Sequence, residues 1–190
     1  PMLMLSVILA LLLGWCTGGR LSRFEEADLR LLPLPVLAFA CQQAMNALAG
    51  RISLPFEAWA WLPLLLSYGL IFLFLWQNRR LKKTCLLVGA GGACNLAVIA
   101  SNGWRMPVAF WAAALLSEQG AAALLAGEIP MYRAADASTR LLFLGDILYC
   151  PLPLFGGLAS LGDILLAAGV FFCLMACMRP SRLPMWLTTG

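Results

Sequence analysis

The chain has 190 residues, of which 62% are hydrophobic and only 12% are charged, and its mean hydropathy is +0.87. Soluble domains are about half apolar and about a quarter charged, so this composition predicts an integral membrane protein. The net charge of +4 comes from basic residues grouped between apolar runs, so we expect a lipid bilayer and no nucleic acid as partner. The sequence has no histidine, which excludes Ser–His and Cys–His nucleophile pairs and the commonest metal ligand. We therefore predict no metal site and no cofactor.

Five apolar runs approach the roughly 20 residues that a helix needs to cross a bilayer. They lie at residues 2–17, 32–49, 59–76, 84–101 and 161–178. The sequence thus predicts an all-α, polytopic transmembrane bundle of about five spanning helices, folded as a single domain over residues 1–190. We expect the first run to be retained, because it lacks the basic residues that open a signal peptide.

The basic residues predict how the chain crosses the membrane. Nine of the thirteen follow the first, third and fifth runs, namely Arg20, Arg23, Arg30, Arg79, Arg80, Lys82, Lys83, Arg179 and Arg182. The other four fall in the remaining loops, at Arg51, Arg105, Arg133 and Arg140. Because Lys and Arg accumulate in cytoplasmic loops, we predict a multi-pass protein of the cell membrane with its N-terminus outside and its C-terminus in the cytoplasm.

Residues 107–127 are apolar and long enough to span a bilayer, but Ser117, Glu118 and Gln119 stand at their centre. A charged side chain at the bilayer midplane costs at least about 2.5 kcal/mol. We therefore interpret this segment as an interfacial or re-entrant helix pair within an external region that covers about residues 103–159.

The pentapeptide LGDIL occurs twice, and each copy places a carboxylate, Asp146 or Asp163, in an apolar stretch. Prolines and glycines between the copies break regular helix and allow the chain to reverse, which could bring the two carboxylates together. Two such carboxylates would share a proton and could hydrolyse a peptide bond without histidine or metal. The 17-residue spacing is equally compatible with two separate sites. The segment "ASLGD" also looks like a helix start, with Ser160 as N-cap and Asp163 in the first turn, a structural role that does not exclude the catalytic one.

Three segments between residues 89 and 169 resemble the lipoprotein signal peptidases, which are aspartic membrane enzymes. The segments are "GAGGACNLAVIASNG" with Asn95, "FLGDIL" with Asp146 and "LASLGDILLAAG" with Asp163. The resemblance implies a catalytic dyad of Asp146 and Asp163 at the external face and a membrane-anchored peptide or lipoprotein substrate. We assign Asn95 and Asn102 as substrate-binding or supporting residues. The chain departs from that family after Asn95, where Leu96 replaces the family's aspartate.

Over its whole length the chain more closely resembles a family of small bacterial membrane proteins of unknown function. The resemblance rests on "GGRLSRFE", "NLAVIASNGWRMPV" and the paired "LGD". It supports the architecture but implies no activity.

Two alternatives to a peptidase remain open at the level of sequence. The first is a non-enzymatic membrane scaffold or partner-binding subunit, in which the aspartates cap helices, Asn95 forms hydrogen bonds between helices and Asn102 ends one. The second is an ion- or proton-coupled transporter that uses Asp163 as a relay.

Overall fold

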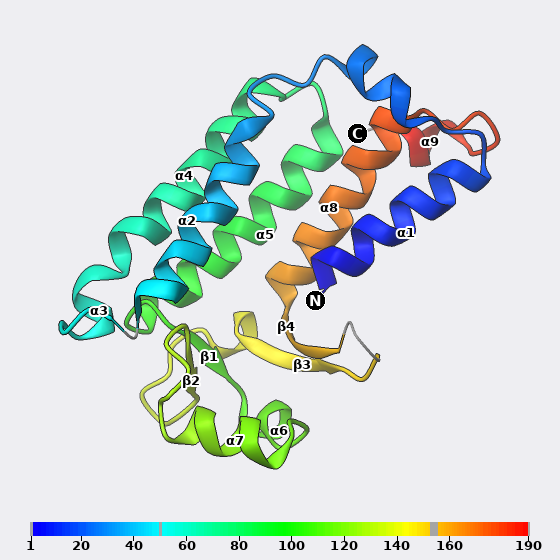
Figure 1. Cartoon of the computed structure of the whole chain (residues 1–190). Helices are drawn as coiled ribbons and strands as arrows, with labels where there is room; N and C mark the ends of the chain where they lie inside the picture. Colours follow the sequence, from blue (N-terminus) through cyan, green and yellow to red (C-terminus); the bar gives the residue numbers. More distant parts are fainter. Residues whose placement is uncertain (1, 50, 153–155, 190) are drawn as a thin grey trace.

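Five long helices dominate the structure, a computed structural model that describes residues 2–49, 51–152 and 156–189 (Figure 1). They are α1 (Met2–Cys16), α2 (Pro33–Ala49), α4 (Trp61–Gln77), α5 (Lys82–Ser101) and α8 (Leu161–Met178). Each lies on one of the five predicted apolar runs. The shorter helices are η1 (Leu21–Ala27), α3 (Phe56–Trp59), α6 (Phe110–Ala113), α7 (Glu118–Leu125), η2 (Leu142–Leu144) and α9 (Met185–Thr188), of which η1 and η2 are 3₁₀-helices.

The prediction of five membrane-spanning helices was wrong. Among the described residues, only α5 and α8 are both long and apolar enough to cross a membrane, and α1 with η1 makes a third only if this pair, bent by 103°, counts as one span. At 1.5 Å per residue, the 17 residues of α4 reach about 25 Å, less than the roughly 30 Å of a bilayer core. Two to three candidate spans still indicate a multi-pass membrane protein.

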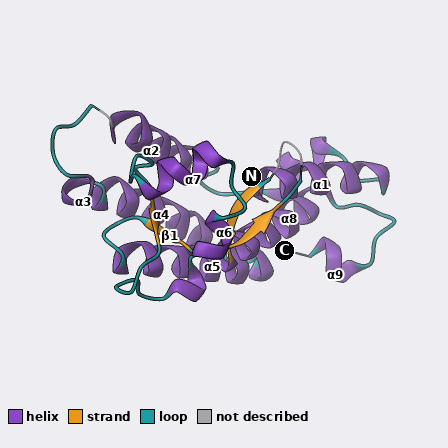
Figure 2. Cartoon of the chain, turned by 90° about the horizontal axis from the view of Figure 1, so that it is seen from below, coloured by secondary structure: helices purple, strands orange, loops and turns teal. Residues whose placement is uncertain are grey.

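Helix α5 lies at the centre of the bundle. It packs against α8 and α4, while α1 packs on α8 and α2 packs on α4, so that α1 and α2 flank the bundle on opposite sides (Figure 2). A side-chain hydrogen bond from Gln42 to Ser67, 2.9 Å long, joins α2 to α4. The backbones of α5 and α8 approach closely at two glycines: a Cβ on Gly91 would lie 2.6 Å from the carbonyl oxygen of Gly162.

A small mixed sheet lies against one end of the bundle and corrects the all-α prediction. Its strands are β1 (Met106–Val108), β2 (Tyr132–Ala134), β3 (Asp146–Cys150) and β4 (Gly157–Ser160), in the order β2-β1-β3-β4. Strand β1 is parallel to both β2 and β3, whereas β3 and β4 are antiparallel. Strands of three to five residues are too short to show a period in the sequence, which is why the pattern did not predict them.

Residues 107–127 form no single spanning helix. Pro107 and Val108 belong to β1, and the segment then forms the short helices α6 and α7. Ser117 caps α7 by accepting a hydrogen bond from the Gly120 N–H. The two short helices cover the sheet on the side away from the bundle (Figure 1). Val108, Ala112 and Leu124 form the core of this layer.

The bundle has one strongly basic end. Helices α1, α4 and α8 end, and α2 and α5 begin, at the end opposite the sheet (Figure 1). The nine basic residues of the first loop, third loop and C-terminal tail therefore gather there, and the other four basic residues lie toward the sheet. This charge separation is the one that the loop counts predict.

Candidate functional site

Asp146 lies at the junction between the sheet and the bundle. It opens β3, next to Val108 of β1 on one side and Ser160 of β4 on the other. Its backbone carbonyl accepts a hydrogen bond from the Ala109 N–H at 3.0 Å, whereas its side-chain Oδ1 has no hydrogen-bond partner among the described residues. The residue is only 2% exposed. Burying a carboxylate without a partner is costly, so this position is not explained by packing alone.

The surroundings of Asp146 favour its protonated form. Burial raises the pKa of this carboxyl group to about 7, and the nearby negative charge of Asp163 raises it further in the same direction. Strand register places the two predicted carboxylates in the same region, because Asp146 pairs with Ser160 and Asp163 lies one helical turn after Ser160.

Asp163 is held in place by a capping box at the start of α8. Its backbone N–H donates to Ser160 Oγ at 3.0 Å, and its Oδ2 accepts from the Ser160 N–H at 3.0 Å. Its Oδ1 accepts from Asn95 Nδ2 at 2.9 Å. The predicted helix start at Ser160 is confirmed, and both carboxylate oxygens of Asp163 have a donor.

Asn95 connects α5 to the start of α8. Besides donating to Asp163, it accepts a hydrogen bond from Ser160 Oγ at 2.9 Å, and it is only 4% exposed. The glycines at 91 and 162 allow this short side chain to bridge the two helices, because a Cβ on Gly162 would overlap the Asn95 amide. Asn95 therefore positions Asp163, by the helix-to-helix hydrogen bonding that its sequence context predicts.

Asn102 ends α5 and lies apart from this network. Its Nδ2 donates to the carbonyls of Val98 at 2.7 Å and Arg140 at 2.8 Å, and its Oδ1 accepts from the Arg140 N–H at 3.0 Å. Its hydrogen bonds in the described structure thus tie the helix end to the loop before η2 and reach neither aspartate. The geometry fits the predicted helix C-cap and makes any supporting role indirect.

Tyr132 belongs to the site, although no sequence pattern pointed to it. It opens the edge strand β2, and desolvation followed by the negative charges of Asp146 and Asp163 raises its pKa to about 12. The residue is 36% exposed. Strand β1 lies between β2 and β3 and so places Tyr132 in the same sheet as Asp146, by a pairing of distant segments that local sequence does not encode.

The described residues offer no evident set of ligands for a metal ion. Within the described residues, no three Cys, Asp or Glu side chains come together as ligands for an ion. The site is therefore two carboxylates, one held by hydrogen bonds and one buried beside it.

Comparison with known proteins places the chain in a family. A family model described as "Family of unknown function (DUF5317)" matches residues 26–175, which include both aspartates, Asn95, Asn102 and Tyr132. No curated protein and no solved structure matches the chain. These comparisons give no evidence for the resemblance to lipoprotein signal peptidases. The match covers most of the sequence, and the chain belongs to DUF5317, a family of unknown function.

Proposed function

We propose that this chain is a membrane-embedded aspartic peptidase-like protein, in which Asp146 and Asp163 form an acid–base dyad that acts on a membrane-anchored peptide or lipoprotein. The observation that carries the proposal is the buried Oδ1 of Asp146, which lacks a hydrogen-bond partner in the described structure and lies within electrostatic reach of Asp163. Orphan polar groups and perturbed pKa values concentrate at functional sites.

The hydrogen bonds assign different roles to the two aspartates. Asp163 accepts from Asn95 and from the Ser160 N–H, which fixes its orientation and suits a general base. Asp146, whose pKa burial raises to about 7, exchanges a proton near neutral pH and suits the acid. Asp163 would take a proton from water as the water oxygen attacks the scissile carbonyl carbon, and Asp146 would give its proton to the carbonyl oxygen. When the C–N bond breaks, the proton on Asp163 would pass to the leaving amine, and a hydroxyl of the tetrahedral intermediate would return a proton to Asp146 as the product carboxyl group forms.

The place of the dyad suits a substrate anchored in the membrane. Asp163 lies in the first turn of α8, a candidate span, and Asp146 lies in the adjoining sheet, so the pair stands at the end of the span. With the basic end of the bundle in the cytoplasm, this end faces outward and the N-terminus is external.

A non-enzymatic scaffold is the second candidate, and the capping box favours it. The bonds among Ser160, Asp163 and Asn95 satisfy every oxygen of Asp163 and join α5 to α8, which is a complete structural role. A transporter relay fits the geometry less well, because Asp163 is in the first turn of α8 rather than near the middle of a span.

N-terminal labelling of membrane proteins tests the proposal in cells that produce the wild-type chain, Asp146→Asn or Asp163→Asn. Both variants should abolish the N-termini that the wild-type chain generates, with cleavage reduced at least about 100-fold, since each removes a group that transfers a proton. Asp163→Asn keeps an acceptor oxygen in the capping box, and Asp146→Asn keeps the size of a buried side chain, so both variants should fold. Asp136→Asn, on an exposed turn of the same external region, is the matched control and should cleave normally.

The outcomes separate the two candidates. Retained cleavage in either single variant would rule out the dyad. If the wild-type chain generates no new N-termini and both variants support normal growth and assembly, the scaffold is the better account.

A further inference from the structure

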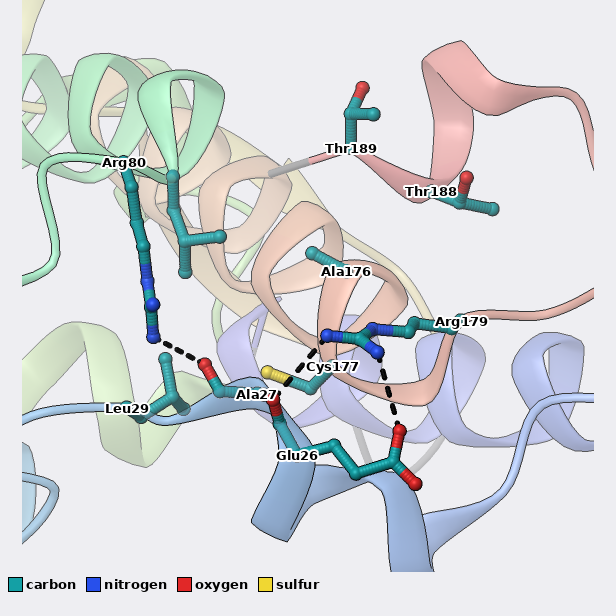
Figure 3. A pocket seen from close by; sticks show the side chains of 10 residues that line it. Glu26, Ala27, Leu29, Arg80, Ala176, Cys177, Arg179, Thr188 and Thr189 are labelled. Carbon is teal, nitrogen blue, oxygen red and sulfur yellow. Dashed lines mark hydrogen bonds and ion pairs between the residues drawn. The ribbon is translucent and has the colours of Figure 1, made fainter.

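A cavity of about 330 Å³ opens at the basic end of the bundle, far from the two aspartates (Figures 1 and 3). Four elements enclose it: η1, the turn between α4 and α5, the end of α8, and α9. Its polar lining is made by Glu26, Arg80, Arg179, Thr188 and Thr189. Figure 3 shows Arg80 and Arg179 reaching the Glu26–Ala27 segment from different elements.

The charge around this cavity is strongly positive. The segments at this end, residues 17–32, 78–83 and 179–189, carry nine Lys or Arg residues and only three acidic residues, Glu25, Glu26 and Asp28. The cavity lining itself holds two arginines and one carboxylate. An anionic ligand is therefore attracted both by the whole end of the bundle and by the cavity.

Arg80 and Arg179 both keep N–H groups that are available to donate hydrogen bonds to a ligand. The contacts of Arg179 with Glu26 are long, 3.3 Å from Nη1 to Oε2 and 3.4 Å from Nη2 to the carbonyl oxygen. Arg80 donates from Nη2 to the backbone carbonyls of Ala27 and Asp28, and its Nη1 lies 3.4 Å from Asp28 Oδ2, which leaves Nε and one Nη1 hydrogen for a ligand. Each arginine side chain is about half exposed, at 51% for Arg80 and 53% for Arg179. A guanidinium has five N–H groups and matches the geometry of phosphate oxygens.

The threonine side of the cavity adds a hydroxyl donor and a third cation. Thr189 Oγ1 accepts a hydrogen bond from Lys83 Nζ at 3.1 Å, which leaves the hydroxyl hydrogen of Thr189 for another acceptor. Lys83 is thereby held next to the cavity. The donors come from different elements of the cavity wall.

The position of the cavity identifies the source of the phosphate. Helix α5 begins at Lys82 and α8 ends at Met178, so the cavity lies where both candidate spans reach the same membrane boundary. Large apolar side chains stand exposed around it, with Trp15 74%, Met185 78% and Trp186 62% exposed. Tryptophans at this level are typical of the lipid headgroup region. We infer that the cavity binds the phosphate headgroup of an anionic phospholipid.

Titration of the purified full-length chain in neutral detergent tests this inference, with the unfolding temperature as readout. Phosphatidylglycerol should raise the unfolding temperature, and phosphatidylcholine and inorganic phosphate at equal concentration should not. Arg80→Gln and Arg179→Gln should each weaken apparent binding by about fivefold, the effect of removing one cation near a lipid surface. Arg80→Lys, which keeps the positive charge, should weaken lipid binding less than Arg80→Gln does.

Neighbouring residues supply matched controls. Arg79 and Glu25 adjoin Arg80 and Glu26 in sequence but do not line the cavity. Glu26→Gln removes the competing carboxylate and should tighten lipid binding. Glu25→Gln and Arg79→Gln alter only the general charge of this end, so each should change lipid binding less than Glu26→Gln and Arg80→Gln do. Glu26→Gln also keeps the test decisive if an arginine variant fails to fold.

Three results would overturn the inference. An equal loss in Arg79→Gln and Arg80→Gln would show general attraction to the surface instead of a site. Equal stabilisation by inorganic phosphate would assign the site to free phosphate. Absence of any difference between phosphatidylglycerol and phosphatidylcholine would show that the cavity binds no anionic lipid.

Discussion

Replacing Asp146 with asparagine should change how the stability of the protein depends on pH. The folded chain raises the pKa of Asp146 from 3.8 to about 7, so the folded state binds a proton that the unfolded state has released between about pH 4 and pH 7. The free energy of unfolding of the wild type therefore decreases as the pH rises through this window, and it is constant above it. Asparagine does not titrate, so the variant lacks this contribution.

The size of the effect follows from the shift. About three pKa units at 1.36 kcal/mol each give roughly 4 kcal/mol. Between about pH 4 and pH 8, the unfolding free energy of Asp146→Asn should therefore rise by up to about 4 kcal/mol relative to that of the wild type. Denaturant unfolding in mild detergent, followed by tryptophan fluorescence at a series of pH values, measures this difference. Subtracting the unfolding free energy of the variant from that of the wild type at each pH removes the contributions of the other titrating groups, which both proteins share.

The result is checked by a second aspartate. Asp136 is exposed and its pKa is lowered to about 2, mainly by hydrogen bonds from Ser138, so Asp136→Asn should leave the pH dependence above about pH 5 unchanged. A difference between wild type and Asp146→Asn that stays constant from about pH 4 to pH 8 would refute the buried, protonated state of Asp146.

Three further changes test the packing and the hydrogen bonds. Gly91→Ala should destabilise the protein by about 1 to 3 kcal/mol, because its Cβ would meet the carbonyl oxygen of Gly162, whereas Gly69→Ala, with open space around it, should be neutral or stabilising in the same denaturant titration. Ser160→Ala should cost about 1 to 3 kcal/mol of unfolding free energy, since it removes the N-cap of α8 and the donor to Asn95, and Ser101→Ala, which removes only a bond within its own helix, should cost less. Ser138→Ala should raise the pKa of Asp136 from about 2 toward 3.8, measured by carboxyl NMR, because the Oγ–H···Oδ1 bond of 2.6 Å is lost; an unchanged pKa would contradict the assigned cause.

The long helices were predictable, but their relation to the membrane was not. Each apolar run corresponds to a helix because hydrophobic runs of this length satisfy their own backbone hydrogen bonds. Whether a helix is long enough to span depends on its ends. The run at 59–76 breaks at Ala60 and begins its long helix only at Trp61, and α1 stops at Cys16 before the chain bends by 103°.

The candidate site also combines features that the local sequence predicts with features that it does not. The helix cap at Ser160 and Asp163 follows from a local pattern of a few residues, as does the polar bridge at Asn95. The pairing of Asp146 with Ser160 depends on the register of β3 against β4, and the approach of Tyr132 depends on β1 lying between β2 and β3. Neither pairing leaves a signal in residues that adjoin each other in the chain.

By itself, the sequence determined that this is an apolar helical protein, where its five long helices lie, which loops carry the positive charge and where α8 is capped. These properties depend on composition and on contacts within a few residues. Only the tertiary structure decided that a four-stranded sheet closes one end of the bundle, that Asp146 is buried beside Asp163, and that Arg80 and Arg179 share a cavity at the other end. Those features join residues from different helices and strands, and they form because packing α5 against α8 and pairing the strands brings those residues together.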